Sequence, residues 1–278
     1  MPEFSAADGT RLHYTDEGTG IPILALAGLT RNTRDFDHVA PHLPQMMPVR
    51  LIRMDYRGRG QSEWADPKTY SIPQEAQDAL ALLDHLGLEK AAILGTSRGG
   101  LIAMLIAATA KDRLLGVALN DIGPEIADSG LADIKDYIGR KPAQKTYTEA
   151  AQFRAMTWTH FEDVPLERWQ AEVRNHYIET PEGLDLRYDA KLRDAVLEAG
   201  AQPTPDLWPF YDAMLGLPLC LIRGANSDLL SEATADEMLR RRIDMIRADI
   251  PGRGHVPFLD EEPALDALHE WLEDIDDH

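Results

Sequence analysis

Short apolar runs alternate with segments of helical periodicity over both ends of the chain. Apolar runs of this length, bounded by glycine, proline or polar residues, are typical of buried strands. Strands are predicted over residues 21–27, 49–54, 91–94, 116–119, 217–222 and 245–250. Helices are predicted over residues 73–86, 101–110 and 264–272. Strands that alternate with helices predict an α/β fold, a mostly parallel sheet flanked by helices on both faces.

The middle of the chain departs from this pattern. Residues 122–207 hold no convincing buried strand, but they do hold helical stretches rich in charged and aromatic residues. We therefore expect a sheet domain made of residues 1–121 and 208–278. Residues 122–207 would form a helical cap, inserted after the sixth strand.

Composition and charge narrow the classes of function. The chain has 278 residues and a net charge of −19, so it would repel a nucleic acid backbone or an anionic membrane surface. Its single cysteine, Cys220, cannot form an intrachain disulfide, as is common in reducing compartments. No secretory signal and no apolar run of membrane-spanning length is visible. We expect a cytoplasmic protein; a homodimer stays open.

The strongest motif is Gly95-Thr96-Ser97-Arg98-Gly99, which matches G-x-S-x-G between a predicted strand and a predicted helix. A tight turn of this kind exposes the serine hydroxyl and requires small residues on either side. The helix that follows directs its N-terminal amides toward developing negative charge. Ser97 is therefore the candidate nucleophile.

The chain resembles the α/β-hydrolase superfamily, in its capped branch of esterases, lactonases, carbon–carbon bond hydrolases and cofactor-free haloperoxidases. The resemblance is carried by the turn at 27–30, the Asp-Tyr-Arg-Gly-Arg-Gly-Gln-Ser segment at 55–62, the motif at Ser97, and the segments 223–228 and 254–257. In this family the nucleophile is followed by the acid and then by the histidine. The 55–62 segment has a structural role there.

The resemblance implies His255 as the base and Asp228 as the orienting acid. Asp228 follows the strand predicted at 217–222, and an acid there could fix the tautomer of the imidazole. Asp121 is a rival, because it follows the strand next to the serine, where some dehalogenase-like relatives carry their acid. We interpret Asp121 as a structural carboxylate and expect Asp228→Asn to lower turnover far more than Asp121→Asn.

The resemblance also assigns the oxyanion hole to the backbone N–H groups of Leu29 and Arg98. Relatives usually carry His-Gly where this chain has Ala27-Gly28. The sequence has no metal-binding motif, and neither a metal nor a cofactor is expected. Water would be the second substrate.

The substrate is less well defined. Trp158 and Phe161 of the cap and Arg31 beside the oxyanion turn are candidate substrate-binding residues. Arginines near the chemistry could bind a substrate carboxylate, although ion pairing with the surplus acids is the simpler interpretation. We expect a serine hydrolase that cleaves a small carboxylic ester or lactone. A carbon–carbon bond hydrolase and a non-catalytic ligand receptor are the alternatives, whereas dehalogenase and epoxide-hydrolase relatives place Asp at the position of Ser97.

Overall fold

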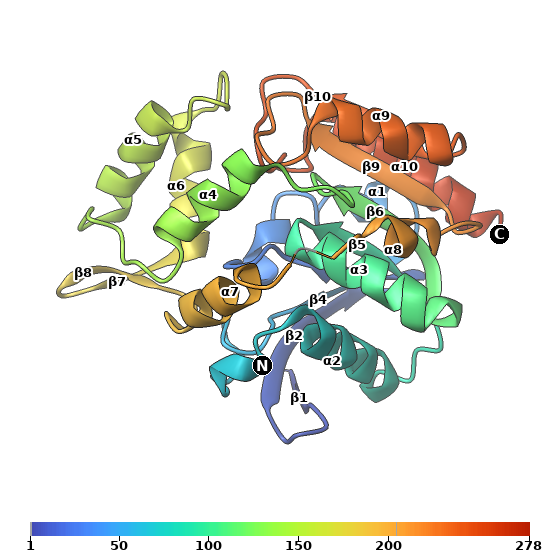
Figure 1. Cartoon of the computed structure of the whole chain (residues 1–278), viewed down its shortest axis with the longest axis horizontal. Helices are drawn as coiled ribbons and strands as arrows, with labels where there is room; N and C mark the ends of the chain where they lie inside the picture. The colour runs from blue at the N-terminus through green and yellow to red at the C-terminus, as the bar shows by residue number, and fades with distance from the viewer. Residues whose placement is uncertain (1, 204) are drawn as a thin grey trace.

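A computed structural model describes residues 2–203 and 205–278. Its main feature is an eight-stranded sheet with the strand order β1-β2-β4-β3-β5-β6-β9-β10 (Figure 1). The strands are β1 (Glu3–Ser5), β2 (Arg11–Gly18), β3 (Ile21–Leu26), β4 (Val49–Met54), β5 (Ala91–Thr96), β6 (Leu114–Asn120), β9 (Leu219–Gly224) and β10 (Ile246–Ile250). From β4 to β10 neighbouring strands are parallel, whereas β1–β2 and β2–β4 are antiparallel. The mostly parallel sheet predicted from the sequence is confirmed.

The first two strands were not expected. β2 contains Arg11, Asp16 and Glu17 and is partly exposed, so it forms no apolar run. Such a strand can be recognised only by its pairing partner, which is β4.

Helices cover both faces of the sheet. On one side lie α2 (Ile72–His85), α3 (Arg98–Thr109), α8 (Trp208–Asp212) and α9 (Glu232–Arg241); on the other lie α1 (Leu43–Met46) and α10 (Glu262–Asp276). Side chains of β3 alternate between the two layers: Leu24 and Leu26 join the first, and Ile23 and Ala25 join the second. The described residues include no helix that is both long and apolar enough to cross a bilayer.

Helix α2 illustrates how the sequence sets an element's limits. The hydroxyl of Ser71 accepts a hydrogen bond from the N–H of Gln74, and Pro73 occupies the first turn. The helix ends just before Gly87, whose φ of +66° suits glycine best. Its apolar stripe faces α3 and the sheet.

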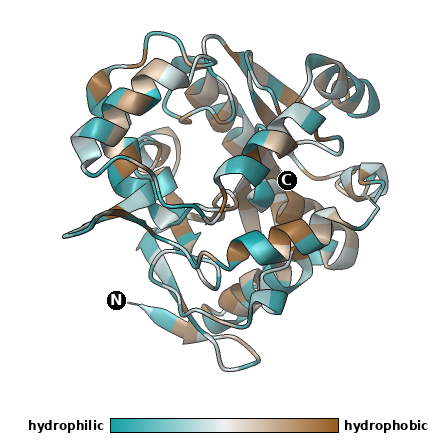
Figure 2. Cartoon of the chain, turned by 60° about the vertical axis from the view of Figure 1, so that its left-hand side comes forward, coloured by the Kyte–Doolittle hydropathy of each residue, from teal (hydrophilic) through white to brown (hydrophobic). Residues whose placement is uncertain are grey.

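Between β6 and β9 the chain leaves the sheet and forms an inserted segment. It comprises α4 (Asp128–Tyr137), α5 (Tyr147–Thr157), α6 (Leu166–His176), β7 (Tyr177–Thr180), β8 (Gly183–Leu186) and α7 (Leu192–Gly200). In Figure 1, α5, α6 and the β7–β8 hairpin stand to the left of the sheet. Hydrophilic and hydrophobic residues both occur along the helices (Figure 2), as expected for helices with one buried face.

The β7–β8 hairpin is a difference from the expected all-helical insertion. Each strand has only four residues, and β7 has no buried residue, so no apolar run marks it in the sequence. The division into residues 1–121, 122–207 and 208–278 stays a prediction.

Candidate active site

Ser97 lies in the tight turn between β5 and α3. Its backbone has a φ of 51° and a ψ of −113°, a strained conformation for a residue with a side chain. The turn is closely packed: a Cβ atom on Gly95 would lie 2.6 Å from the Gly100 nitrogen, and one on Gly99 would overlap the Leu26 carbonyl oxygen. The turn therefore has no room for a side chain at Gly95 or Gly99.

His255 reaches Ser97 from the loop that follows β10. Its Nε2 lies 3.0 Å from Ser97 Oγ, within hydrogen-bond distance. The His255 side chain is only 18% exposed. The structure thus brings together two of the three residues expected from the sequence, although 158 positions separate them.

The third expected residue, Asp228, is not the partner of His255. Asp121 takes that place: its Oδ2 lies 2.6 Å from His255 Nδ1. The Asp228 carboxylate instead lies 4.0 Å from His160 Nε2. The expected placement of Asp228 at His255 is therefore corrected, because Asp121 occupies it; which acid serves in catalysis stays a prediction.

Strand register explains this correction. Thr96 at the end of β5 pairs with Asn120 at the end of β6, and the Ser97 N–H donates to the Asn120 carbonyl. Asp121 therefore follows its strand directly beside the serine. Asp228, by contrast, comes four residues after β9 ends at Gly224, beyond a turn closed by the Ser227 N–H to the Gly224 carbonyl. The sequence shows that Asp121 and Asp228 each follow a strand. It does not show how the chain turns after each strand, and so it does not show which of the two carboxylates reaches His255.

Asp121 is held firmly in this position. It is fully buried, and its Oδ1 accepts a 2.8 Å hydrogen bond from the Gly224 N–H. Its Oδ2 also accepts a 2.6 Å hydrogen bond from the Ser227 hydroxyl. These donors satisfy a buried carboxylate that would otherwise be costly.

Leu29 and Arg98 lie beside Ser97 and line the same cavity. Neither N–H has an acceptor among the turn, loop and cap hydrogen bonds of residues 2–203 and 205–278. One buried carboxylate links the two residues. Glu75 accepts a 2.5 Å hydrogen bond from Arg98 Nε and lies 2.8 Å from Arg59 Nη1, while Arg59 Nε donates to the Leu29 carbonyl over 3.0 Å.

Arg59 belongs to the 55–62 segment, which has the structural role that the resemblance implied. Within this segment Asp55 accepts hydrogen bonds from the N–H groups of Thr33 and Gln61. The Tyr56 hydroxyl donates to the Ala27 carbonyl over 2.8 Å. The turn that lacks the family's usual histidine is thus supported from this segment.

A cavity of about 630 Å³ opens at Ser97. Most of its wall is apolar, and the inserted segment contributes α4 and α7 to it. Its apolar lining consists of Leu29, Ile72, Leu101, Ile122, Ile126, Leu131, Ile134, Ala195, Val196, Ala199 and Leu229. The residues from α4 and α7 were not expected as site residues. Their only sequence signal is helical spacing, as between Leu131 and Ile134, and a core helix has the same spacing.

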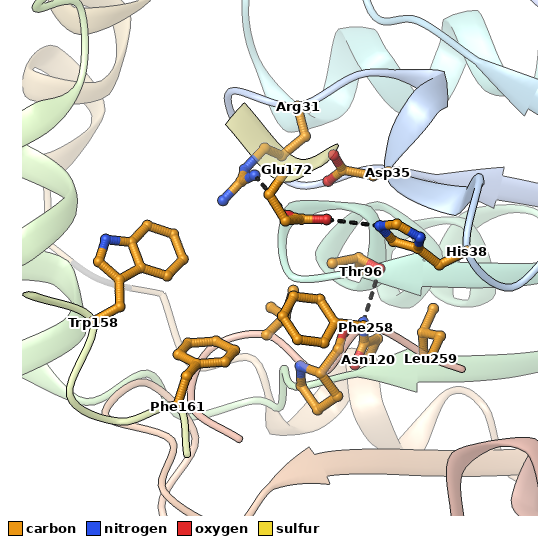
Figure 3. A pocket seen from close by; sticks show the side chains of 12 residues that line it. Arg31, Asp35, His38, Thr96, Asn120, Trp158, Phe161, Glu172, Phe258 and Leu259 are labelled. Carbon is orange, nitrogen blue, oxygen red and sulfur yellow. Dashed lines mark hydrogen bonds and ion pairs between the residues drawn. The ribbon is translucent and has the colours of Figure 1, made fainter. Parts of the chain in front are cut away.

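Trp158, Phe161 and Arg31 lie elsewhere. They line a separate cavity of about 30 Å³, together with Thr96 and Val256, the neighbours of Ser97 and His255. Trp158 and Phe161 also pack edge-to-face against Trp169, at ring-centroid distances of 5.4 and 5.5 Å, and so form the aromatic core of the insertion. Figure 3 shows the Arg31 guanidinium directed into the space between Glu172 and Trp158.

No group of three or more His, Cys, Asp and Glu side chains in the described ranges is arranged to hold a metal ion. We assign no residue to a metal or a cofactor.

Comparisons with known proteins agree with this geometry. Residues 21–262 match the family model for the alpha/beta hydrolase fold. The chain is 36% identical over 240 residues to a 3-hydroxybutyrate-oligomer hydrolase of Cupriavidus necator, covering 83% of this chain and 80% of the relative. It is 30% identical over 175 residues to the lipase LipV of Mycobacterium tuberculosis, covering 62% and 64%. An alpha/beta hydrolase structure from Novosphingobium aromaticivorans superimposes with a TM-score of 0.90 at 35% identity, covering 98% and 97% of the two chains. The chain therefore belongs to the α/β-hydrolase family and is a hydrolase.

Proposed function

We propose that the protein is a serine hydrolase that cleaves a small carboxylic ester or lactone through an acyl-enzyme on Ser97. The observation that carries this proposal is the continuous hydrogen-bonded chain from Ser97 through His255 to Asp121. A serine hydroxyl is a weak nucleophile unless an adjacent base removes its proton. In serine hydrolases this base is a histidine, and a buried carboxylate orients the histidine.

The mechanism follows from these positions. Ser97 Oγ attacks the substrate carbonyl while His255 Nε2 takes the hydroxyl proton. Asp121 stabilises the imidazolium that forms. The N–H groups of Leu29 and Arg98 donate to the oxyanion, and His255 returns the proton to the leaving group. Water, activated by the same histidine, then releases the acyl group.

The apolar cavity beside Ser97 supports a substrate with an aliphatic acyl or alcohol part. The relative from Cupriavidus necator, named as an oligomer hydrolase for 3-hydroxybutyrate, supports an ester of a small hydroxy acid. A serine at position 97 in place of aspartate favours acyl transfer over dehalogenation or epoxide opening.

A fluorophosphonate probe tests the proposal. We expect it to label Ser97, as located by peptide mass spectrometry, and to leave Ser97→Ala unlabelled. A panel of p-nitrophenyl esters, lactones and dienoates would then give turnover with the first two classes. Turnover of dienoates alone would replace the proposal by carbon–carbon bond hydrolysis. Absence of labelling and of turnover would point to a ligand receptor.

A further inference from the structure

Two arginines converge on one histidine behind the small cavity. Arg31 Nη1 and Arg154 Nη1 each lie 2.6 Å from His176 Nδ1. Burial lowers the pKa of His176 well below its ordinary value, and the charges of Arg31 and Arg154 lower it further. The imidazole is therefore neutral, with one lone pair on Nδ1. A single lone pair cannot satisfy two guanidinium groups.

Neither guanidinium finds a close carboxylate. Arg154 is only 6% exposed, and it has no carboxylate oxygen within 4 Å among the residues that the structure describes. It lies over the ring of Trp158, 4.7 Å from its centroid. Arg31 comes no closer than 3.9 Å to Glu172, which also accepts from His38 over 3.0 Å. The buried Arg154 and the half-buried Arg31 thus share a neutral acceptor, an arrangement that an additional anion would stabilise.

The neighbouring acids only partly balance these charges. Burial raises the pKa of Asp35 to about 7, so this carboxyl is partly protonated near neutral pH. Burial would also raise the pKa of Glu172, but the hydrogen bond from His38 and the charge of Arg31 bring it below its ordinary value. The cluster therefore has one firmly ionised acid for two arginines.

The cluster lies next to the nucleophile. Arg31 Cγ and Ser97 Cβ are both within 4 Å of the position where Gly28 would carry a Cβ atom. The cavity beside Arg31 has room for roughly two water-sized groups, about the size of the two oxygens of a carboxylate. Thr96, the residue before Ser97, also lines this cavity.

We propose that Arg31 and Arg154 form a subsite for a carboxylate of the substrate, so that the preferred ester carries a free acid close to the scissile bond. This inference rests on the proposed function and names its substrate class. A carboxylate has about four acceptor positions, enough to serve both guanidinium groups. The large apolar cavity would hold the other, aliphatic part of the ester.

Two substrates that differ only in this group test the subsite: 3-(butanoyloxy)butanoate and 3-(butanoyloxy)butanamide, with butyrate release as the measurement. We expect kcat/KM to be roughly tenfold or more higher for the carboxylate, the difference that charge-assisted hydrogen bonds provide. In Arg154→Gln the ratio of kcat/KM for the carboxylate to kcat/KM for the amide should fall at least about tenfold and approach one. Arg140→Gln removes an exposed arginine of the same insertion and should keep the wild-type ratio.

A second measurement needs only the wild-type protein. With p-nitrophenyl butyrate as substrate, 3-hydroxybutyrate should inhibit roughly tenfold more strongly than 3-hydroxybutanamide. Equal inhibition, or equal kcat/KM for the two esters, would overturn the subsite. If Ser97 is still labelled in that case, the ester hydrolase proposal stands. Loss of labelling and of all ester turnover would instead refute the proposed function itself.

Discussion

At the scale of single residues, the site depends on two carboxylates that the sequence does not distinguish from ordinary buried acids. Asp121 faces His255, and Glu75 lies between Arg59 and Arg98, at the back of the oxyanion turn. Both are buried. Asp121 accepts hydrogen bonds from more than one donor, whereas Glu75 accepts one from Arg98 and forms an ion pair with Arg59. Their roles differ, because Asp121 contacts the base directly and Glu75 acts only through two arginines.

The first prediction concerns the acid. Asp121→Asn should lower kcat roughly 1,000- to 10,000-fold, because an amide cannot stabilise the imidazolium and favours the wrong tautomer. Asp228→Asn, at the position that the sequence favours, should change kcat by no more than a few-fold. Steady-state kinetics with p-nitrophenyl butyrate would measure both. The opposite ranking would restore Asp228 as the acid.

The second prediction concerns Glu75 as a positioning residue. Glu75→Gln should lower kcat roughly 10- to 100-fold and change KM little, because both oxyanion residues lose their common anchor while substrate binding does not use it. Asp78→Asn is the matched control: it removes a buried carboxylate one turn along α2 that pairs with Arg57. Both variants should lose thermal stability. Equal effects on kcat would show that Glu75 only stabilises the fold.

At the scale of elements, α4 and α7 form the wall of the large cavity, and the two helices pack against each other. Helix α7 also contacts η2 (Pro67–Thr69), which ties the insertion to the sheet domain. Their inward residues set the depth of this cavity. Under the proposed function, chain-length preference would therefore be a property of the insertion, whereas the chemistry would belong to the sheet.

The third prediction tests this division. Val196→Trp should fill part of the cavity and lower kcat/KM for p-nitrophenyl octanoate at least about tenfold relative to p-nitrophenyl acetate. Leu197→Trp changes the next residue of α7, which is 39% exposed and does not line the cavity, so it should keep the wild-type ratio. A ratio unaffected by Val196→Trp would mean that the chain binds elsewhere.

At the scale of the whole molecule, the cluster of Arg31, Asp35, Arg154, Glu172 and His176 joins the sheet domain to the insertion. Arg31 comes from the loop after β3 and Asp35 from the short helix η1 (Thr33–Phe36) that follows it, whereas the other three residues come from α5 and α6. Buried charge at such a junction makes stability depend on pH. The interface also has an apolar part, formed by Phe258 and the aromatic rings of the insertion. Further polar contacts cross it, such as the ion pair of Arg168 with Asp260.

The fourth prediction gives this dependence a sign. Burial raises the pKa of Asp35 from 3.8 to about 7, so the folded protein retains a proton that the unfolded chain releases. The protonated Asp35 carboxyl therefore contributes to the free energy of unfolding. This contribution is complete below about pH 4 and is lost as the pH rises through 7. Asp35→Asn should therefore gain Tm relative to wild type between pH 5 and pH 8.

Thermal unfolding followed by circular dichroism at the two pH values would measure this gain. Asp133→Asn, at an exposed position of α4, should show no such gain. A constant difference between Asp35→Asn and wild type at both pH values would contradict the assignment.

The sequence by itself determined the alternation of strands and helices and the turn at Ser97, and the family resemblance implied the histidine at 255. The strand pattern and the turn are local features, because apolar runs and the glycines that a tight turn requires can be recognised along the chain. Together with the resemblance, their recognition was enough to predict the parallel sheet and two of the three residues that meet at the site.

Only the tertiary structure decided which acid contacts His255, which residues form the wall of the cavity, and that the two arginines lie close together. Asp121 and Asp228 both follow strands, and the choice between them depends on strand register and on the length of the turn after β9. Arg31 and Arg154 are 123 positions apart, and nothing local brings them together. Such contacts follow from how the elements pack, because a strand or helix pattern records which face is buried but not which residue it meets.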